Sequence, residues 1–449
     1  RFDSLQEGNM ELKVVKFGGS SLADAAHFQK VAGIIRADDA RRYVIPSAPG
    51  KRFDGDEKVT DLLYALHRAY GGEGDPVPLF TKIKKRFDEI IAALQLNLSL
   101  DCEYLKIEKD LEKGAGADYA ASRGEYLNGI ILSAYLGFTF IDAATCIFFR
   151  ADGQLDPEKT NNYLKGLLKA YPKAVIPGFY GIMPDGQVTT FSRGGSDITG
   201  SIVARASAAT LYENWTDVSG FLMADPRCVN NPRRIEIITY KELRELAYMG
   251  ATVLHDEAVF PVRYVGIPIS IKNTNRPEDP GTLIVPGAEE IIPDTIITGI
   301  AGKTGFVAVT IEKVRMNLEL GFGRKVFEVF EKYGLCIEHL PSSIDSISVI
   351  VNANQFKPLR SSIIADIYRA TDPDSLVIDE HIAMIAVVGR GMVRNKGTAA
   401  RIFRALAESK INIKMIDQGS SELNIIVGVE EKDFHAALRA IYAEFVPAK

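Results

Sequence analysis

A glycine pair directly after the first apolar run is the feature that most narrows the folds open to this chain. Residues 13–17 (KVVKF) have the pattern of a buried strand, a Gly-Gly-Ser-Ser turn follows at 18–21, and residues 22–37 have helical periodicity. A second apolar run covers 43–47. Strand, glycine-rich turn, helix and strand in this order predict the start of a parallel sheet flanked by helices.

Later patterns extend this organisation to about residue 292. Residues 81–136 are rich in helix formers and charge, and they predict a mostly helical insert. The runs 174–176 and 188–191 flank a Pro-Asp-Gly turn and predict a β-hairpin. A Pro/Gly-rich stretch at 277–287 predicts a domain boundary. We therefore expect one α/β domain over residues 10–292.

From residue 295 onward, two segments share the order strand, loop, helix, strand, strand. The first consists of 306–311, 325–333, 336–340 and 346–351, and the second of 382–388, 398–409, 411–416 and 422–429. An internal duplication of a small α+β module explains this best, and two unrelated α+β stretches are the alternative. We place the two modules at 296–372 and 380–449.

Composition excludes several classes of protein. A net charge of −5 argues against broad nucleic-acid binding. The scattered cysteines Cys102, Cys146, Cys228 and Cys336 argue against a disulfide framework or a zinc site, and they fit a cytoplasmic protein. No apolar run reaches the roughly 18–20 residues of a membrane span. The polar residues 1–9 lack the apolar core of a signal peptide, and Met10 is the expected natural start.

Lys16 ends the first predicted strand, just before Gly18, Gly19 and Ser20. Glycine lets backbone N–H groups approach a phosphate closely, and a lysine there can stabilise charge on a transferring phosphoryl group. The segment matches neither GxxxxGK[ST] nor GxGxxG. A simple tight turn is the competing interpretation.

Three other clusters carry possible chemistry. Arg193 and Asp197 surround a Gly-Gly at a predicted helix start, where arginine can grip a carboxylate and where Asp197 can alternatively cap the helix. Glu125 lies on an otherwise apolar helix, where it can meet a substrate ammonium or pair with Arg123. The Trp-Thr-Asp-Val run at 215–218 ends a strand, as nucleotide sites in open α/β sheets do, although an Asx-type turn also fits.

Together these motifs are far more specific than any of them alone. Five motifs occur in a fixed order along the chain. They are Lys-Phe-Gly-Gly-Ser-Ser at 16–21, Ser-Arg-Gly-Glu at 122–125, Phe-Ser-Arg-Gly-Gly-Ser-Asp at 191–197, Trp-Thr-Asp-Val at 215–218 and Asp-Pro-Arg at 225–227. The series resembles the aspartate kinases of the amino acid kinase family over nearly the whole chain. Residues 411–427 also resemble the second ACT domain of that family.

The resemblance implies a three-layer α/β/α amino acid kinase domain followed by two α+β, ferredoxin-like ACT domains. It implies transfer of the γ-phosphate of ATP, with Mg²⁺, to the β-carboxylate of L-aspartate. The product would be 4-phospho-L-aspartate, at the first step of lysine, threonine and methionine biosynthesis. A carboxylate nucleophile is ionised at pH 7, so no strong general base is needed. In the family, the second ACT domain includes a strand that precedes the first ACT domain in the sequence. Residues 296–309 would then belong to the second ACT domain at 380–449.

Residue roles follow from the resemblance as well. The catalytic pair would be Lys16 and Asp197. Aspartate would be bound by Ser47, Thr60, Glu125 and Arg193. ATP would contact Lys16, Gly18, Gly19, Ser20, Thr216, Asp217, Leu222, Arg227, Thr252 and Val253. Two positions depart from the family pattern, since Leu222 replaces a frequent tyrosine and Thr252 replaces a lysine that contacts ATP. No residue is assigned as a metal ligand.

The ACT pair implies regulation by an amino acid, with lysine favoured over threonine, and a homodimer formed through these domains. Effector contacts would come from Met316, Gly321, Phe322, Ser343 and Asp345. Three rival functions compete with this interpretation. One is another carboxylate kinase of the family, such as an acetylglutamate kinase. Another is an amino-acid sensor built on an inactive kinase domain. The third, a bifunctional kinase–homoserine dehydrogenase, would need more chain than 449 residues.

Overall fold

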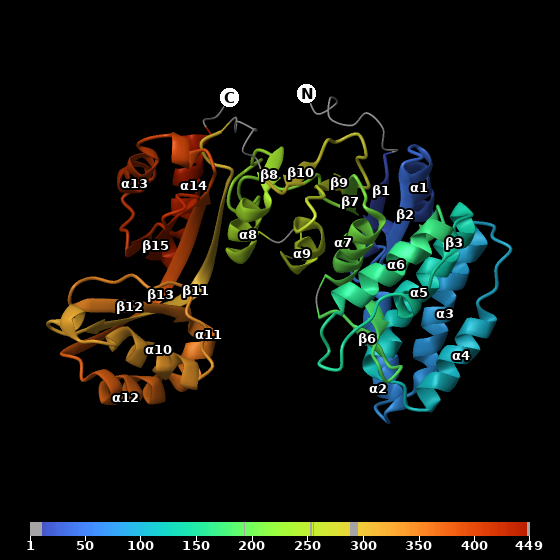
Figure 1. Cartoon of the computed structure of the whole chain (residues 1–449), viewed down its shortest axis with the longest axis horizontal. Helices are drawn as coiled ribbons and strands as arrows, with labels where there is room; N and C mark the ends of the chain where they lie inside the picture. Colours follow the sequence, from blue (N-terminus) through green and yellow to red (C-terminus); the bar gives the residue numbers. More distant parts are fainter. Residues whose placement is uncertain (1–10, 193, 252–253, 255, 288–294, 447–449) are drawn as a thin grey trace. The chain divides into compact units, whose positions relative to one another are not determined.

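The computed structural model describes residues 11–192, 194–251, 254, 256–287 and 295–446. The chain divides into two compact units, which are coloured from blue to red along the sequence in Figure 1. The first unit comprises residues up to 221 with 236–240 and 253–288. The second comprises 222–235, 241–252 and 289–449. Among the described residues, no helix is both long and apolar enough to cross a bilayer.

An eight-stranded sheet forms the centre of the first unit, in the order β3-β4-β2-β1-β7-β9-β10-β8. Its strands are β1 (Lys13–Phe17), β2 (Arg41–Pro46), β3 (Thr139–Phe140), β4 (Ala174–Val175), β7 (Leu211–Thr216), β8 (Ile237–Thr239), β9 (Ile269–Asn273) and β10 (Thr282–Val285). All neighbouring strands are parallel except β9 and β10. The predicted parallel sheet is therefore confirmed.

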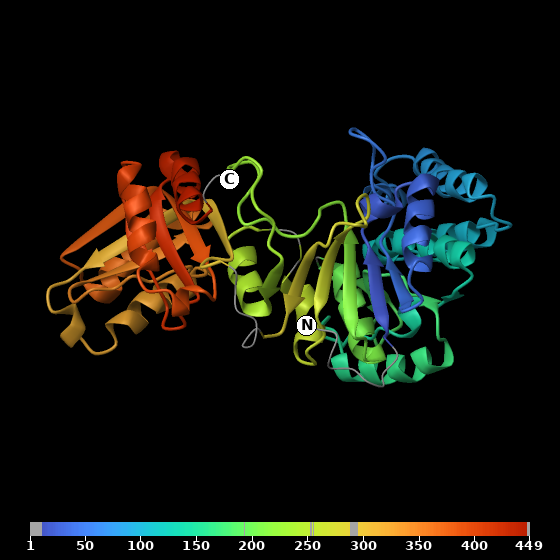
Figure 2. The same ribbon diagram turned by 90° about the horizontal axis from the view of Figure 1, so that it is seen from above.

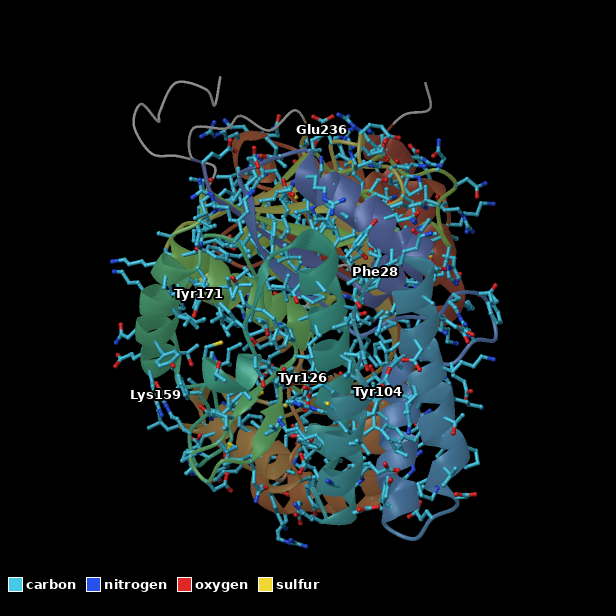
Figure 3. The ribbon with its side chains drawn as sticks, turned by 90° about the vertical axis from the view of Figure 1, so that its right-hand side faces the viewer. Phe28, Tyr104, Tyr126, Lys159, Tyr171 and Glu236 are labelled. Carbon is cyan, nitrogen blue, oxygen red and sulfur yellow. The ribbon has the colours of Figure 1, made fainter. Side chains whose placement is uncertain are left out.

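Helices cover both faces of this sheet (Figure 2). They are α1 (Ala25–Arg36), α2 (Val59–Tyr70), α3 (Pro76–Ala93), α4 (Asp101–Glu112), α5 (Ala117–Leu136), α6 (Pro157–Ala170), α7 (Gly195–Ser207) and α9 (Phe260–Arg263). Helix α7 packs on β1, β2 and β7, whereas α5 packs on β2, β3 and β4. Helices α3, α4 and α5 are the predicted helical insert. In Figure 3, Tyr104 marks α4 and Tyr126 marks α5, and the Tyr126 hydroxyl donates to Glu103 of α4 at 2.9 Å.

One sequence prediction in this unit is wrong. The predicted hairpin does not begin at 174–176, because the fully buried β4 pairs in parallel with β2 and β3 instead. The Pro-Asp-Gly turn joins β5 (Tyr180–Ile182) to β6 (Val188–Thr190), which form a separate two-stranded sheet. The Pro/Gly-rich stretch 277–287 contains β10, which lies between β9 and β8, and the last segment of the first unit ends directly after it, at residue 288.

A five-stranded antiparallel sheet, ordered β12-β11-β13-β15-β14, forms the centre of the second unit. The strands are β11 (Gly299–Glu312), β12 (Ser346–Asn352), β13 (Ser375–Val388), β14 (Met415–Asp417) and β15 (Asn424–Glu430). The helices are α8 (Tyr240–Tyr248), α10 (Phe322–Lys332), α11 (Ala353–Phe356), α12 (Arg360–Thr371), α13 (Thr398–Glu408) and α14 (Phe434–Phe445). Short 3-10 turns are η1 (Gly19–Leu22), η2 (Ala143–Thr145), η3 (Asp256–Val259), η4 (Met316–Leu318), η5 (Lys357–Leu359), η6 (Met392–Arg394) and η7 (Glu431–Asp433).

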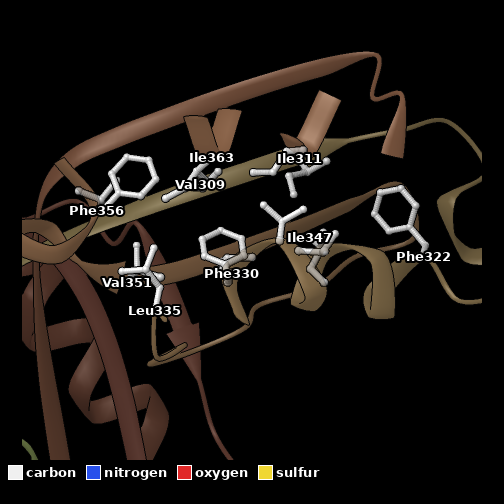
Figure 4. Packing of buried hydrophobic residues seen from close by; sticks show 14 of the residues in the cluster. Val309, Ile311, Phe322, Phe330, Leu335, Ile347, Val351, Phe356 and Ile363 are labelled. Carbon is white, nitrogen blue, oxygen red and sulfur yellow. The ribbon is translucent and has the colours of Figure 1, made fainter. Parts of the chain in front are cut away.

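The second unit repeats one pattern, with β11, α10, β12 and α12 followed by β13, α13, β15 and α14. The sequence prediction missed the last helix of each half. It also placed a strand at 336–340, where the structure has a single bridge between His339 and Ile350. The long strands β11 and β13 serve both halves, because 299–303 pair with 384–388 while 306–312 pair with 375–382. Phe330, Val351 and Phe356 lie in the fully buried core of the first half (Figure 4).

Candidate active site

Lys16 lies at the end of the central strand β1 in a compact polar triad. Its Nζ atom is 2.5 Å from Oδ1 of Asp197, in the first turn of α7. Asn214 on the neighbouring strand β7 accepts from Nζ of Lys16 at 3.4 Å and donates to Oδ1 of Asp197 at 2.8 Å. The parallel register places Lys16 beside Asn214, so the contact follows directly from the strand pairing.

Asp197 is not the N-cap of α7, so that alternative from the sequence is wrong. The helix begins at Gly195, and its N-cap is Gly194 in the left-handed conformation, with φ of 58°. A left-handed N-cap favours glycine, which lacks a Cβ atom. The Asp197 carboxylate is instead bound by Lys16 of β1 and Asn214 of β7.

The glycine turn after β1 packs closely against a second glycine. The N–H of Gly50 donates to the carbonyl of Gly19 at 2.8 Å. A Cβ atom on Gly50 would lie 2.6 Å from the carbonyl carbon of Gly19, and one on Gly19 would lie 2.8 Å from the carbonyl oxygen of Ala48. Glycine is therefore required at both positions, because no side chain fits between the two backbones. The carbonyl of Trp215 accepts from the N–H of Gly18 at 3.0 Å and holds the turn to β7.

A pocket of about 580 Å³ opens beside this turn. Its lining includes six of the residues with predicted roles, namely Gly19, Ser20, Ser47, Thr60, Glu125 and Asp217. The segment 50–58 supplies most of the remaining lining. Residues separated by almost 200 positions in the sequence therefore meet at the carboxyl ends of β1, β2 and β7, where open α/β sheets bind ligands.

Glu125 is the buried carboxylate of this pocket. It projects from α5, and its residue is 5% exposed. Burial raises the pKa of Glu125 to about 8, although hydrogen bonds from the backbone N–H groups of Ala48 and of Glu125 itself act in the opposite direction. Its Oε2 atom has no hydrogen-bond partner among the described residues. A buried carboxylate with an unused oxygen in a pocket can receive a cationic group of a ligand.

Arg123, the alternative partner of Glu125, is occupied by aromatic rings. Its guanidinium lies 4.6 Å, 4.4 Å and 5.3 Å from the ring centroids of Tyr119, Tyr126 and Tyr180. Its Nε and Nη2 atoms donate to the hydroxyl of Ser122. Such contacts stabilise a buried arginine without a carboxylate, so they leave Glu125 to the pocket.

The predicted ATP residues fall in several places. Thr216 ends β7 and its hydroxyl donates to Asp217 at 3.2 Å. Leu222 and Arg227 belong to the second unit, where Leu222 is 38% exposed and the Arg227 guanidinium pairs with Asp225 at 2.6 Å. Thr252 and Val253 lie outside the described residues, as does Arg193, which was predicted to bind aspartate. Their roles stay predictions.

The predicted effector residues lie close together within the second unit. The carboxylate of Asp345 accepts from the N–H of Arg315 at 2.8 Å, and the N–H of Asn317 donates to the carbonyl of Ile344 at 3.2 Å. Gly321 is the left-handed N-cap of α10, with φ of 78°. The side chains of Met316 and Phe322 belong to the hydrophobic core of this unit.

Comparison with known proteins identifies the family. The model of the amino acid kinase family matches residues 11–273, and that of an ACT domain matches residues 385–445. Aspartokinase 3 of Bacillus subtilis is 40% identical over 97% of this chain and 98% of its own length. The chain belongs to the aspartate kinases.

Solved aspartate kinase structures agree with the fold. The Clostridium acetobutylicum aspartate kinase, described as an allosteric enzyme, has a TM-score of 0.89 and 50% identity, with 98% of this chain and all of that chain covered. Escherichia coli aspartokinase III in complex with aspartate and ADP has a TM-score of 0.74 and 23% identity, over 97% and 99% of the two chains. The predicted fold class, a kinase domain with ACT domains, is confirmed. The chain is an ATP-dependent aspartate kinase.

Two features of the aspartate kinase site were missed from the sequence. Asn214 gave no signal, because a single asparagine in a strand is common and its bond to Asp197 depends on tertiary packing. The segment 51–58 was also missed, although it holds three basic residues within eight positions, Lys51, Arg52 and Lys58, together with Asp54, Asp56 and Glu57.

Replacing Asn214 with leucine is expected to lower kcat about 10- to 100-fold, since hydrogen bonds to charged groups contribute about 1.5–3 kcal/mol. The variant removes the group that holds both Lys16 and Asp197. Steady-state kinetics should show the loss in kcat rather than in the KM for aspartate. An unchanged kcat in a protein of normal thermal stability would show that Asn214 only packs the strand.

Proposed function

We propose that this aspartate kinase transfers the γ-phosphate of ATP to the β-carboxylate of L-aspartate, giving 4-phospho-L-aspartate. The observation that carries this proposal is the pocket in which the glycine turn after Lys16 meets the half-partnered carboxylate of Glu125. The backbone of the glycine turn suits a phosphate, and the Glu125 carboxylate suits an ammonium. The product would feed lysine, threonine and methionine biosynthesis.

Each residue would act by holding charge in place. The Glu125 carboxylate would bind the substrate ammonium, and Ser47, Thr60 and Arg193 would bind the remaining polar groups of aspartate. The backbone at Gly18, Gly19 and Ser20 would hold phosphate oxygens. Lys16, oriented by Asp197 and Asn214, would neutralise the transferring phosphoryl group. The aspartate carboxylate attacks already ionised, so positioning supplies most of the catalysis.

ATP would enter as its Mg²⁺ complex. Among the described residues, no group of three or more His, Cys, Asp or Glu side chains is arranged to hold a metal ion. This fits a magnesium ion bound mainly by phosphates and water, with one or two carboxylates from the protein. Asp217, which lines the pocket, is the carboxylate we assign to it. Thr216, Leu222, Arg227, Thr252 and Val253 would contact the nucleotide.

The second unit would bind an amino-acid effector, for which we favour lysine over threonine. The predicted residues are Met316, Gly321, Phe322, Ser343 and Asp345. Asp345 and Ser343 are exposed, and Asp345 carries a charge suited to an ammonium. Escherichia coli aspartokinase III, whose fold is similar, has been solved in complex with lysine and aspartate.

A homodimer through the second unit is also part of the proposal. Val314, Leu318, Leu320 and Ile344 are apolar and between 65% and 98% exposed. Clustered exposed apolar residues are typical of protein interfaces. We assign residues 10–292 to the kinase domain, with ACT domains at 296–372 and 380–449.

The test is phosphorylation of L-aspartate by the purified chain with ATP and Mg²⁺, with the acyl phosphate trapped as its hydroxamate. Turnover of aspartate but not of N-acetylglutamate is the expected result. Lysine and threonine, each added separately, would identify the effector by inhibition. Tight amino-acid binding without any turnover would favour the sensor function instead.

A further inference from the structure

The segment between β2 and α2 forms one wall of the substrate pocket. Its residues Lys51, Arg52, Phe53, Asp54 and Lys58 line the cavity, together with the backbone at Pro49 and Gly50. Three of these side chains are cationic and one is anionic. The lining side chains therefore carry a net positive charge, although the whole segment 50–58 is neutral because Asp54, Asp56 and Glu57 balance its three bases. The lining lies in the same pocket as the Glu125 carboxylate.

An ion-pair network holds this wall in one conformation. Asp56 accepts hydrogen bonds from the backbone and guanidinium of Arg52 at 2.9–3.0 Å. It also pairs with Arg86 of α3 at 2.8 Å, where the two side chains are 6% and 10% exposed. The hydrogen bonds from Arg52 hold the pKa of Asp56 well below its usual range, despite its burial. The carboxylate thus stays ionised throughout the physiological range.

Arg86 is also linked to the glycine turn after β1, by way of the backbone of Gly50. Its Nη2 atom donates to the carbonyl of Gly50 at 2.6 Å. The N–H of Gly50 in turn donates to Gly19 at 2.8 Å, where the two backbones touch. One buried guanidinium therefore fixes the start of the segment through Gly50 and its far part through Asp56.

We propose that Lys51 and Lys58, the pocket-lining lysines of this segment, form a cationic recognition wall for the acidic amino acid, and that Arg86 positions this wall through Gly50 and Asp56. This inference rests on the proposed function, because it names the element that selects the substrate. Aspartate has two carboxylates and one ammonium, and Glu125 can meet only the ammonium. Cations fixed on the opposite wall attract the carboxylates, and they do so better when their backbone is already ordered.

The Arg86–Asp56 tie can be tested against a matched control on the same two elements. Lys82 and Glu57 also join α3 to this segment, at 3.1 Å, but their side chains are 59% and 58% exposed. Neither of them lines the pocket. Exposed pairs contribute little. Glu57→Gln therefore removes an ion pair from the same segment without disturbing the wall.

Asp56→Asn and Arg86→Lys are the test variants. The asparagine keeps the shape of Asp56 without its charge, and lysine cannot span Gly50 and Asp56 with a planar fork. We expect each to raise the KM for L-aspartate about tenfold, with kcat and the KM for ATP within about twofold, as for loss of binding shared by ground and transition states. The KM for aspartate of the double variant should not exceed that of the more impaired single variant, because both substitutions break the same ion pair.

Calorimetric titration with L-aspartate supplies a readout that does not need turnover. If the wild-type protein binds aspartate without phosphorylating it, the proposed function is overturned. The dissociation constants of the variants for aspartate would still test the role of Asp56 and Arg86 in binding. Unchanged aspartate binding in folded Asp56→Asn protein would overturn the inference. An equal loss in Glu57→Gln would overturn it as well. Since Asp56 lies on a loop, its variant decides the matter even where Arg86→Lys does not fold.

Discussion

Lys16→Met is expected to lower kcat about 10²- to 10³-fold, the usual effect of removing one group that stabilises transition-state charge. Lys16 is held at 2.5 Å from Asp197 and lies at the end of the central strand, beside the glycine turn. Its ammonium would neutralise the phosphoryl group in transit. Methionine retains the length of the side chain without its charge. Single-turnover measurement of phosphoryl transfer would isolate this step from product release.

Lys13→Met is the matched control for this result. Lys13 lies on the same strand but pairs with Asp38 at 2.9 Å, at the opposite end from the pocket. It should retain nearly full kcat. A loss of less than about tenfold for Lys16→Met, with Lys13→Met unaffected, would contradict a direct role of Lys16 in charge stabilisation.

Glu125→Gln is expected to raise the KM for aspartate by about 30- to 4000-fold, since truncating one partner of a buried charge pair costs about 2–5 kcal/mol. Glutamine fills the same volume but cannot offer a charge to the substrate ammonium. The KM for ATP should change little, because Glu125 lies on the amino-acid side of the pocket. Equal increases in both KM values would indicate a structural defect, not a lost substrate contact.

The same residue should give aspartate binding a pH dependence. Burial raises the pKa of Glu125 to about 8, so the free enzyme carries a proton there at neutral pH. A neutral carboxyl binds an ammonium poorly, and binding must release that proton. We expect kcat/KM for aspartate to rise with pH up to about 8 and to level off above it. Glu125→Gln should lose this rise, and calorimetry in buffers of different ionisation enthalpy would count the released proton.

Stability should respond to pH in the opposite direction. The folded-state pKa of Glu125 is raised from its ordinary value of 4.5, so the folded protein binds more protons between about 4.5 and 8. Its contribution to stability is complete below that window and declines as pH rises through it. Thermal unfolding of wild type and Glu125→Gln from pH 5 to 9 would reveal the difference. A constant difference in Tm across that range would mean that Glu125 is ionised throughout.

Local patterns in the sequence were enough to predict the architecture. The 3.6-residue and two-residue periodicities identified most helices and strands, because burial of one face imposes them on any chain. The order of the short motifs identified the family, and the glycines at 18–19 predicted the tight turn beside Lys16. These features depend on residues that are neighbours in the chain, so a sequence displays them directly.

Contacts between distant residues were decided by the tertiary structure. Strand β4 joined the central sheet because β2 and β3 bury it, and Asp197 bound Lys16 rather than the helix end. Strand pairing brings Asn214 beside Lys16 from 198 positions away. Arg86 reaches Gly50 across 36 positions, and the pKa of Glu125 is raised to about 8 because the folded chain buries its side chain. Pairing, burial and dielectric environment are properties of packing, and no local pattern encodes them.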